Sequence, residues 1–147
     1  MRVLLIFLLA MTPLPFAAAQ DATYIYVYET LTSGKRSWLA ITFDGEPAAE
    51  LRRGMFFAIR TTPGSHMVGL NGGVSVAVEL KAGEEAFVRL GRNRLVGAPP
   101  IPKLYVSINP THNRMTNLRY VKENKIHSDA VARSDPRPPP RLKTRED

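Results

Sequence analysis

Three histidines and no cysteine limit the chemistry open to this 147-residue chain. His66, His112 and His127 share no common spacing, and no His-x-His or His-x-x-x-His pair occurs. A zinc site needs three or four converging ligands, which these histidines do not supply. The lack of cysteine also removes disulfides, thiol nucleophiles and thiolate metal sites. We therefore expect no metal and no cofactor.

The serines and paired acids do not form a catalytic pattern either. Ser65 and Ser75 lack the Gly-x-Ser-x-Gly elbow that exposes a nucleophilic serine. Glu84 and Glu85 are adjacent, and adjacent residues of a strand point to opposite faces, so they cannot act as a paired acid and base. The sequence predicts no catalytic residues, and we expect a protein that is not an enzyme.

His66 follows a Pro63-Gly64 turn and has two interpretations. As a functional residue it would be a ligand or an acid/base group. As a structural residue it would occupy an inward-facing position and hydrogen-bond to a neighbouring turn. We favour the structural interpretation, because no other candidate catalytic group lies at a related spacing.

Charge is distributed unevenly along the chain. Residues 20–88 contain six basic and eight acidic side chains, whereas residues 89–125 contain eight basic ones and Glu123 alone. The eight are Arg89, Arg92, Arg94, Lys103, Arg114, Arg119, Lys122 and Lys125. They are the candidate residues for binding an anionic surface. The alternative is a solvated basic surface that aids solubility.

The first residues predict export. Met1-Arg2 precedes a nine-residue apolar run, which is too short for a membrane span of about 20 residues. Ala17-Ala18-Ala19 forms a small-residue cleavage site, so residues 1–19 are predicted to be a secretory signal peptide. No later segment predicts a membrane span. We expect an exported protein, periplasmic or secreted, and because export separates it from the genome we expect no nucleic-acid partner.

Alternating apolar residues predict short strands through most of the chain. The runs span residues 24–30, 38–43, 46–51, 55–60, 66–70, 74–80, 85–90 and 103–108. Turn signals separate them at Asp44-Gly45, Pro63-Gly64, Asn71-Gly72 and around Gly83. Seven or eight such strands, without β-α-β alternation, predict an all-β fold: an antiparallel β-sandwich over residues 20–127.

Two strands have unusual composition. Tyr24, Tyr26 and Tyr28 alternate, which places three rings on one face of the first strand. They could form a sugar-stacking platform, but we favour packing at the half-buried edge of the core. Residues 55–60 are apolar on both faces, which predicts a strand lying between two layers.

The C-terminal part is predicted to be less regular. Met115, Leu118 and Val121 lie at helical spacing, so we expect a short helix within Thr111–Lys125. From Ser128 to Asp147 the chain is polar and rich in proline and arginine. Such a segment cannot bury enough apolar surface to order itself, and we expect residues 128–147 to be a disordered tail.

The spacing of the turns resembles that of a known family. The segments that carry the resemblance are Tyr24–Glu29, the Phe43-Asp44-Gly45 hairpin, Leu51 with Gly54-Met55-Phe56-Phe57, Pro63-Gly64-Ser65-His66 and Lys81-Ala82-Gly83-Glu84. Together they resemble the bacterial family called domain of unknown function 2846, over about Ala22–Ile108. The resemblance implies an exported, transthyretin-like or PEGA-like sandwich without an established activity. Ala86-Phe87 stand where the family usually has two tyrosines.

These observations lead to one functional expectation and two alternatives. We expect an exported, non-enzymatic binding or accessory module of the cell envelope, with an anionic polymer, a lipid surface or an envelope protein as partner. The first alternative is a domain that docks a protein partner along an exposed strand edge. The second is an enzyme whose site the sequence does not show.

Overall fold

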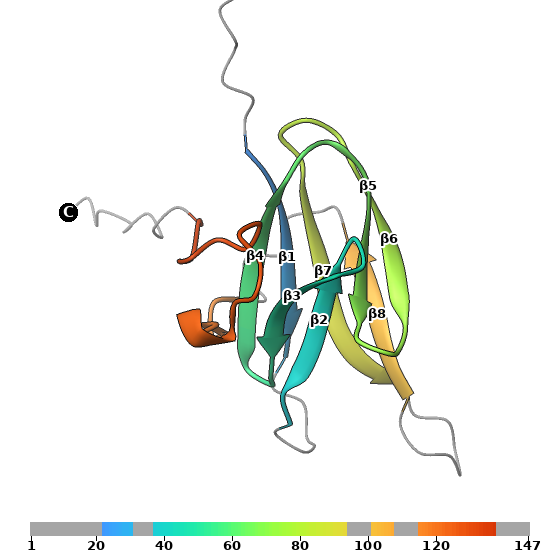
Figure 1. Ribbon diagram of the computed structural model, residues 1–147, viewed down its shortest axis with the longest axis vertical. Helices are drawn as coiled ribbons and strands as arrows, with labels where there is room; N and C mark the ends of the chain where they lie inside the picture. Colours follow the sequence, from blue (N-terminus) through green and yellow to red (C-terminus); the bar gives the residue numbers. More distant parts are fainter. Residues whose placement is uncertain (1–21, 31–36, 94–100, 108–114, 138–147) are drawn as a thin grey trace, which may run out of the picture.

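The computed structural model describes residues 22–30, 37–93, 101–107 and 115–137. Their strands form two packed sheets (Figure 1). The elements are β1 (Thr23–Glu29), β2 (Leu39–Phe43), β3 (Glu46–Leu51), β4 (Met55–Thr61), β5 (Gly64–Leu70), β6 (Ser75–Leu80), β7 (Glu85–Asn93), β8 (Ile101–Ser107), β9 (Arg119–Tyr120) and the 3-10 turn η2 (Glu123–Lys125). The predicted all-β sandwich is confirmed.

The strand order shows a feature that periodicity does not predict. The five-stranded sheet has the order β8-β7-β1-β4-β9, and the four-stranded sheet has the order β3-β2-β5-β6. Most neighbours are antiparallel, but β1 pairs with β7 and β4 pairs with β9 in parallel. The four-stranded sheet is antiparallel as expected, whereas the five-stranded sheet is mixed. A parallel pair needs a long connection between its two strands. Between β1 and β7 the chain forms β2 and β3 of the four-stranded sheet, then β4 beside β1, and then β5 and β6 of the four-stranded sheet.

The turn residues have the backbone conformations that their types favour. Asp44 and Gly45 both have positive φ, at 49° and 85°, as the two central residues of a type I′ hairpin require. Gly72 and Gly83 also have positive φ, at 70° and 74°. These local preferences explain why the hairpins lie where the sequence predicts them.

Two apolar clusters stabilise the domain. The larger lies between the sheets and includes Ile25, Val27, Phe57, Val68 and Val78, all fully or almost fully buried. The smaller lies on the outer face of the five-stranded sheet. It contains Tyr26, Tyr28, Phe56, Ala58, Phe87 and Met115. Both faces of β4 are thus buried, as its composition predicts.

The helix predicted within Thr111–Lys125 is corrected: the described residues there form β9 and, as their only helical element in the element order, the three-residue 3-10 turn η2. Around Leu118–Val121, where the helix was expected, the backbone bonds to β4: Arg119 N–H donates to Gly54 O at 2.9 Å, and Val121 N–H donates to Phe56 O at 2.9 Å. Met115 and Val121 are buried, so their spacing indicated burial but not backbone conformation.

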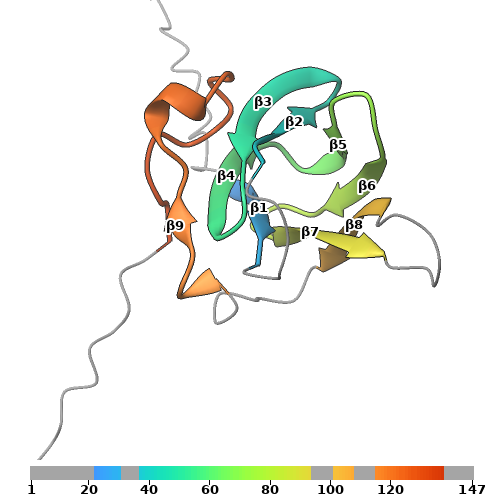
Figure 2. The same ribbon diagram turned by 90° about the horizontal axis from the view of Figure 1, so that it is seen from below.

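The predicted disorder from Ser128 is also corrected for residues 128–137. Val131 is 1% exposed and pairs with Ile59, while Arg60 N–H donates to Ala130 O at 2.7 Å. We call Met115–Arg137 the C-terminal segment. It lies beside β4, on the side of the sandwich away from β6 and β8 (Figures 1 and 2). Polar composition did not prevent order because the β4 edge offers hydrogen-bond partners.

Residues 1–19 and 138–147 lie outside the described residues, so the predicted signal peptide and the rest of the predicted tail stay predictions. No helix in the described part of the chain has the length and apolar character needed to cross a membrane.

Candidate functional site

The structure separates those of the eight candidate basic residues whose side chains it describes. Arg89 lies in β7, Lys103 in β8 and Arg119 in β9, with Lys122 and Lys125 following in the C-terminal segment. Arg92 lies in β7 without a described side chain, and Arg94 and Arg114 lie outside the described residues. Strands β8 and β9 are the opposite edges of the five-stranded sheet. At about 4.8 Å per strand they are about 19 Å apart, which exceeds a Debye length at physiological salt.

One group forms around an aromatic ring on β7 and β8. Arg89 Cζ lies 4.6 Å from the centroid of the Tyr105 ring, and Lys103 Nζ lies 5.4 Å from it. Arg89 is directly opposite Tyr105, and Gly91 is directly opposite Lys103. A Cβ at Gly91 would be 2.9 Å from Tyr105 Cε2, so the glycine leaves room for the ring. We call Arg89, Lys103 and Tyr105 the β7–β8 cationic face.

The cations of this face keep their charge available. The ion pairs found among the described residues include neither Arg89 nor Lys103. A cation over an aromatic ring contributes about 0.5–1 kcal/mol at an exposed site, and it restrains the side chain without neutralising it. Arg89 and Lys103 can therefore donate hydrogen bonds to an anion.

Lys125 differs from these two cations because an acid neutralises it. Its Nζ lies 2.7 Å from Glu50 Oε2 and 4.6 Å from the centroid of the Trp38 ring. His127 Nε2 lies 3.2 Å from the other Glu50 oxygen. The hydrogen bonds from Lys125 and then His127 hold the pKa of Glu50 below its usual value. Lys125 thus links the C-terminal segment to β3, and it no longer counts among the candidate residues for binding an anionic surface.

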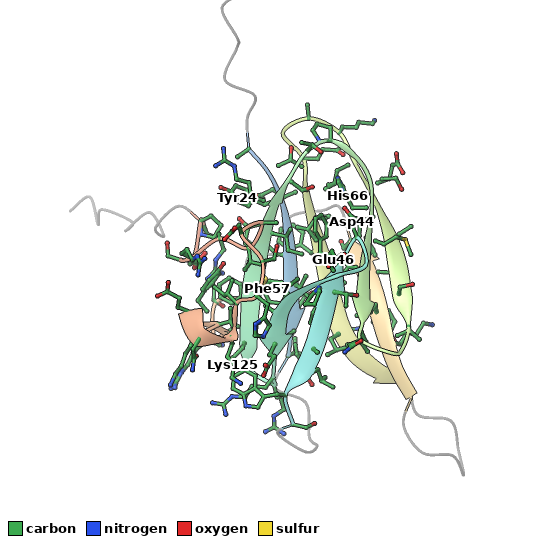
Figure 3. All side chains as sticks on the ribbon, viewed as in Figure 1. Tyr24, Asp44, Glu46, Phe57, His66 and Lys125 are labelled. Carbon is green, nitrogen blue, oxygen red and sulfur yellow. The ribbon has the colours of Figure 1, made fainter. Side chains whose placement is uncertain are left out.

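His66 belongs to a second polar cluster, at the other end of the sandwich from Lys125 (Figure 3). His66 Nδ1 lies 2.8 Å from Asp44 Oδ2, in the β2–β3 turn. His66 Nε2 lies 2.8 Å from Thr62 O and 3.0 Å from Thr61 Oγ1, where β4 passes to β5. The Phe43 ring stacks on the imidazole at 5.2 Å. His66 therefore does bond to a neighbouring turn, as the structural interpretation requires.

The cluster has the connectivity of an Asp–His–hydroxyl relay, but a hydrogen bond to the Thr62 carbonyl opposes that chemistry while the ring is charged. A carbonyl oxygen only accepts, so the contact with Thr62 O requires a proton on Nε2. A general base would need a lone pair on Nε2 to take the Thr61 proton. A charged His66 ring is an ion-paired donor to Asp44 Oδ2 and Thr62 O, and it has no lone pair on Nε2. Sequence reasoning did not identify Thr61 and Thr62, whose only signal is their place before the Pro63-Gly64 turn.

Opposing effects act on the pKa values of this cluster. Desolvation lowers the pKa of His66, but the hydrogen bonds to Asp44 and Thr62 O outweigh it and leave this pKa above its usual value. Desolvation likewise raises the pKa of Asp44, but bonds from His66 and the Met67 N–H leave it below its usual value. Both shifts favour the ion pair.

Tyr26 and Tyr28 are too deeply buried for sugar stacking, and the favoured packing at a half-buried edge is corrected, because β1 is the central strand of its sheet. Tyr26 and Tyr28 are 1% and 2% exposed beneath the C-terminal segment. The Tyr26 hydroxyl donates to Glu85 Oε1 at 3.3 Å, and burial raises the pKa of Tyr26 far above its usual value. Glu84 instead accepts from the Lys81 N–H at 2.8 Å, so the adjacent acids Glu84 and Glu85 have separate structural roles.

Within the described ranges, no group of three or more His, Cys, Asp or Glu side chains is arranged to hold a metal ion. Comparison with family models, with curated proteins and with solved structures finds no match. The resemblance to the domain of unknown function 2846 family therefore stays a prediction.

Proposed function

We propose that this chain is an exported, non-enzymatic binding module of the cell envelope, whose β7–β8 cationic face contacts an anionic polymer or lipid surface. The observation that carries this proposal is the pair of cations held at 4.6 and 5.4 Å over Tyr105, without an ion-pair partner among the described residues. The predicted signal peptide supports the location, and the family resemblance agrees with an exported sandwich.

The chemistry of the face favours phosphate or carboxylate groups presented on an extended surface. Arginine offers a planar set of donors that matches either anion, and lysine adds a point charge. The two residues lie on paired strands, with β8 at the sheet edge. Both can therefore touch one surface at the same time.

The test compares two double variants that remove the same charge. Purified residues 20–147 would be co-sedimented with phosphatidylglycerol vesicles, phosphatidylcholine vesicles and cell-wall sacculi at increasing salt. A basic residue near an anionic surface contributes about 1 kcal/mol, so R89Q/K103Q should weaken binding by about 30-fold. The control R119Q/K122Q alters exposed residues in and just after β9, at the opposite edge of the five-stranded sheet, and should have a much smaller effect.

Two results would reject this assignment. Equal losses in both double variants would mean that net charge, and not the β7–β8 cationic face, determines binding. An absence of binding to every anionic surface at low salt would remove the envelope-surface proposal as a whole.

Docking along a strand edge is the second candidate, and the fold restricts where it can occur. The C-terminal segment covers the β4 edge, and Ile126 pairs with Ala49 at the β3 edge. The outermost strand β9 has only two residues, so β6 and β8 remain as the candidate edges. Capture of one envelope protein that does not weaken with salt would favour this candidate over the electrostatic one.

A further inference from the structure

His66 joins parts of the chain that belong to different sheets. Its ring lies on β5 of the four-stranded sheet, and Asp44 lies in the β2–β3 turn of that sheet. Thr61 ends β4 of the five-stranded sheet. Thr62 begins the short β4–β5 crossover, which leads to the four-stranded sheet. Figure 3 shows His66 and Asp44 next to each other. The contacts of one side chain thus determine how the crossover is held against the hairpin.

The Asp44 side of this contact is firmly positioned. Asp44 Oδ1 accepts from the Met67 N–H at 2.8 Å, and the Asp44 N–H donates to Met67 O at 2.8 Å. The carboxylate is therefore fixed while its second oxygen faces His66 Nδ1. A carboxylate can only accept at this atom, so Nδ1 carries a proton in both charge states of the ring.

The Nε2 side offers two oxygens of different kinds. Thr62 O, at 2.8 Å, can only accept a hydrogen bond, whereas Thr61 Oγ1, at 3.0 Å, can accept or donate. A charged ring donates from Nε2 to Thr62 O. A neutral ring has a lone pair on Nε2, which repels the carbonyl but accepts from the Thr61 hydroxyl. Both partners are already within hydrogen-bond distance, so the exchange needs no large movement.

We propose that His66 is a protonation-controlled clamp, which ties the Thr62 carbonyl of the β4–β5 crossover to the Asp44 turn when charged and exchanges that carbonyl for the Thr61 hydroxyl when neutral. The clamp is distinct from the β7–β8 cationic face and does not depend on the proposed function.

The neighbours of the ring support the charged state. Asp44 faces it from the β2–β3 turn, and the charge of Glu79 acts on it from β6. Phe43 stacks on it from β2, and Val78 of β6 lies directly opposite His66. These contacts agree with a raised pKa, which makes the charged ring stabilising.

The sign of the pH dependence follows from linkage. A group with a raised pKa in the folded state contributes stability that is fully present below its unfolded pKa, near 6.5 for histidine. That contribution is lost as the pH rises through the folded pKa of His66. The pKa of Asp44 is lowered, so its contribution is lost only as the pH falls through that value. The clamp is therefore strongest at mildly acidic pH.

The test follows the protonation of each ring nitrogen by NMR and the thermal midpoint, Tm, from about pH 5 to about pH 9. In the wild-type protein we expect both nitrogens of His66 to be protonated at the acidic end and only Nδ1 at the basic end. Tm should fall by a few degrees across the transition. His66→Gln should abolish this step, and His127→Gln, which alters an exposed histidine, should leave it intact.

Thr61→Val provides the sharper variant because it replaces the hydroxyl with a methyl group and keeps the shape of the side chain. It should leave Tm near the wild-type value at the acidic end and lower it at the basic end, where the hydroxyl is the partner. Equal changes in the Tm of Thr61→Val at acidic and at basic pH would overturn the proposed exchange of the Thr62 carbonyl for the Thr61 hydroxyl. An unprotonated Nε2 at the acidic end would overturn the clamp itself, even if His66→Gln failed to fold.

Discussion

The two sheets differ in what covers their outer faces. On the five-stranded sheet, Tyr26, Tyr28 and Phe56 are almost completely buried beneath the C-terminal segment. On the four-stranded sheet, Met67 is 43% exposed and its cross-strand partner Ala77 is also exposed. Both sheets share one core, so this core does not explain the difference. Large aromatic side chains require a cover, whereas small or isolated apolar ones tolerate water.

The C-terminal segment also supplies hydrogen-bond partners for the backbone of β4. The Ala58 N–H donates to the Tyr120 hydroxyl at 3.2 Å, and that hydroxyl donates to Ala132 O at 2.7 Å. The Ala132 N–H donates to Ala58 O at 2.9 Å. The Tyr120 side chain thus adds a second link between β4 and the C-terminal segment, beside the direct backbone bonds. Burial raises the pKa of Tyr120 to about 12, as expected for a hydroxyl held away from water.

The largest expected effect comes from placing the same charge on each outer face. Ala58 is fully buried on the outer face of the five-stranded sheet, and Ala77 is exposed on that of the four-stranded sheet. Ala58→Asp should lower the free energy of unfolding by more than about 3 kcal/mol, because it buries an unpaired carboxylate. Ala77→Asp should change it by less than about 0.5 kcal/mol. Urea unfolding measures both values.

Similar losses in the two variants would contradict the distinction between the faces. A small loss in Ala58→Asp alone would mean that the C-terminal segment moves away readily and admits water.

Removal of the bridging hydroxyl should have an intermediate effect. Tyr120→Phe keeps the ring against Phe56 but leaves the Ala58 N–H and the Ala132 carbonyl without this partner. We expect a loss of about 1–3 kcal/mol in the free energy of unfolding, with an unchanged urea m-value. Tyr105→Phe is the matched control, since no hydrogen bond of its hydroxyl is found among the described residues. Equal losses would show that ring polarity in general, and not the bridge, is responsible.

The smallest expected effect concerns the attachment of the C-terminal segment to β3. Lys125→Gln removes the first cause of the lowered pKa of Glu50, so that pKa should rise toward its usual value. The lowered pKa stabilises the fold above the unfolded value and ceases to do so as the pH falls through the folded value. The variant should therefore lose less stability on acidification than the wild-type protein does. An NMR titration of Glu50 tests the shift, and an unchanged pKa would contradict the assigned cause.

Local signals predicted the strands and hairpins well. The Asp44-Gly45 and Asn71-Gly72 turns and the alternating residues of β6 depend on neighbours in sequence, so they are visible without the fold. The same signals failed between Met115 and Arg137, where hydrogen bonds to β4 organise the backbone. Helical spacing of Met115, Leu118 and Val121 indicated burial correctly, yet one-sided burial is compatible with more than one backbone path.

The candidate sites follow the same division. The sequence identified Arg89 and Lys103 as basic and His66 as a residue that bonds to a turn. It did not show that two cations contact the Tyr105 ring, that Glu50 neutralises Lys125, or that Thr61 and Thr62 contact His66. These contacts join residues of different strands, and pairing between strands is not encoded in the period of either one.

By itself, the sequence determined the fold class, the positions of the hairpins and the apolar character of both faces of β4. Alternation, turn residues and composition act over a few neighbouring positions, so they specify local structure directly. The tertiary structure decided that β1 pairs in parallel with β7 and that the C-terminal segment covers Tyr26 and Tyr28. It also decided that the described basic candidates divide between the two edges of the five-stranded sheet. Each of these depends on which edge or face remains unsatisfied after the strands pair, which is a property of the whole fold.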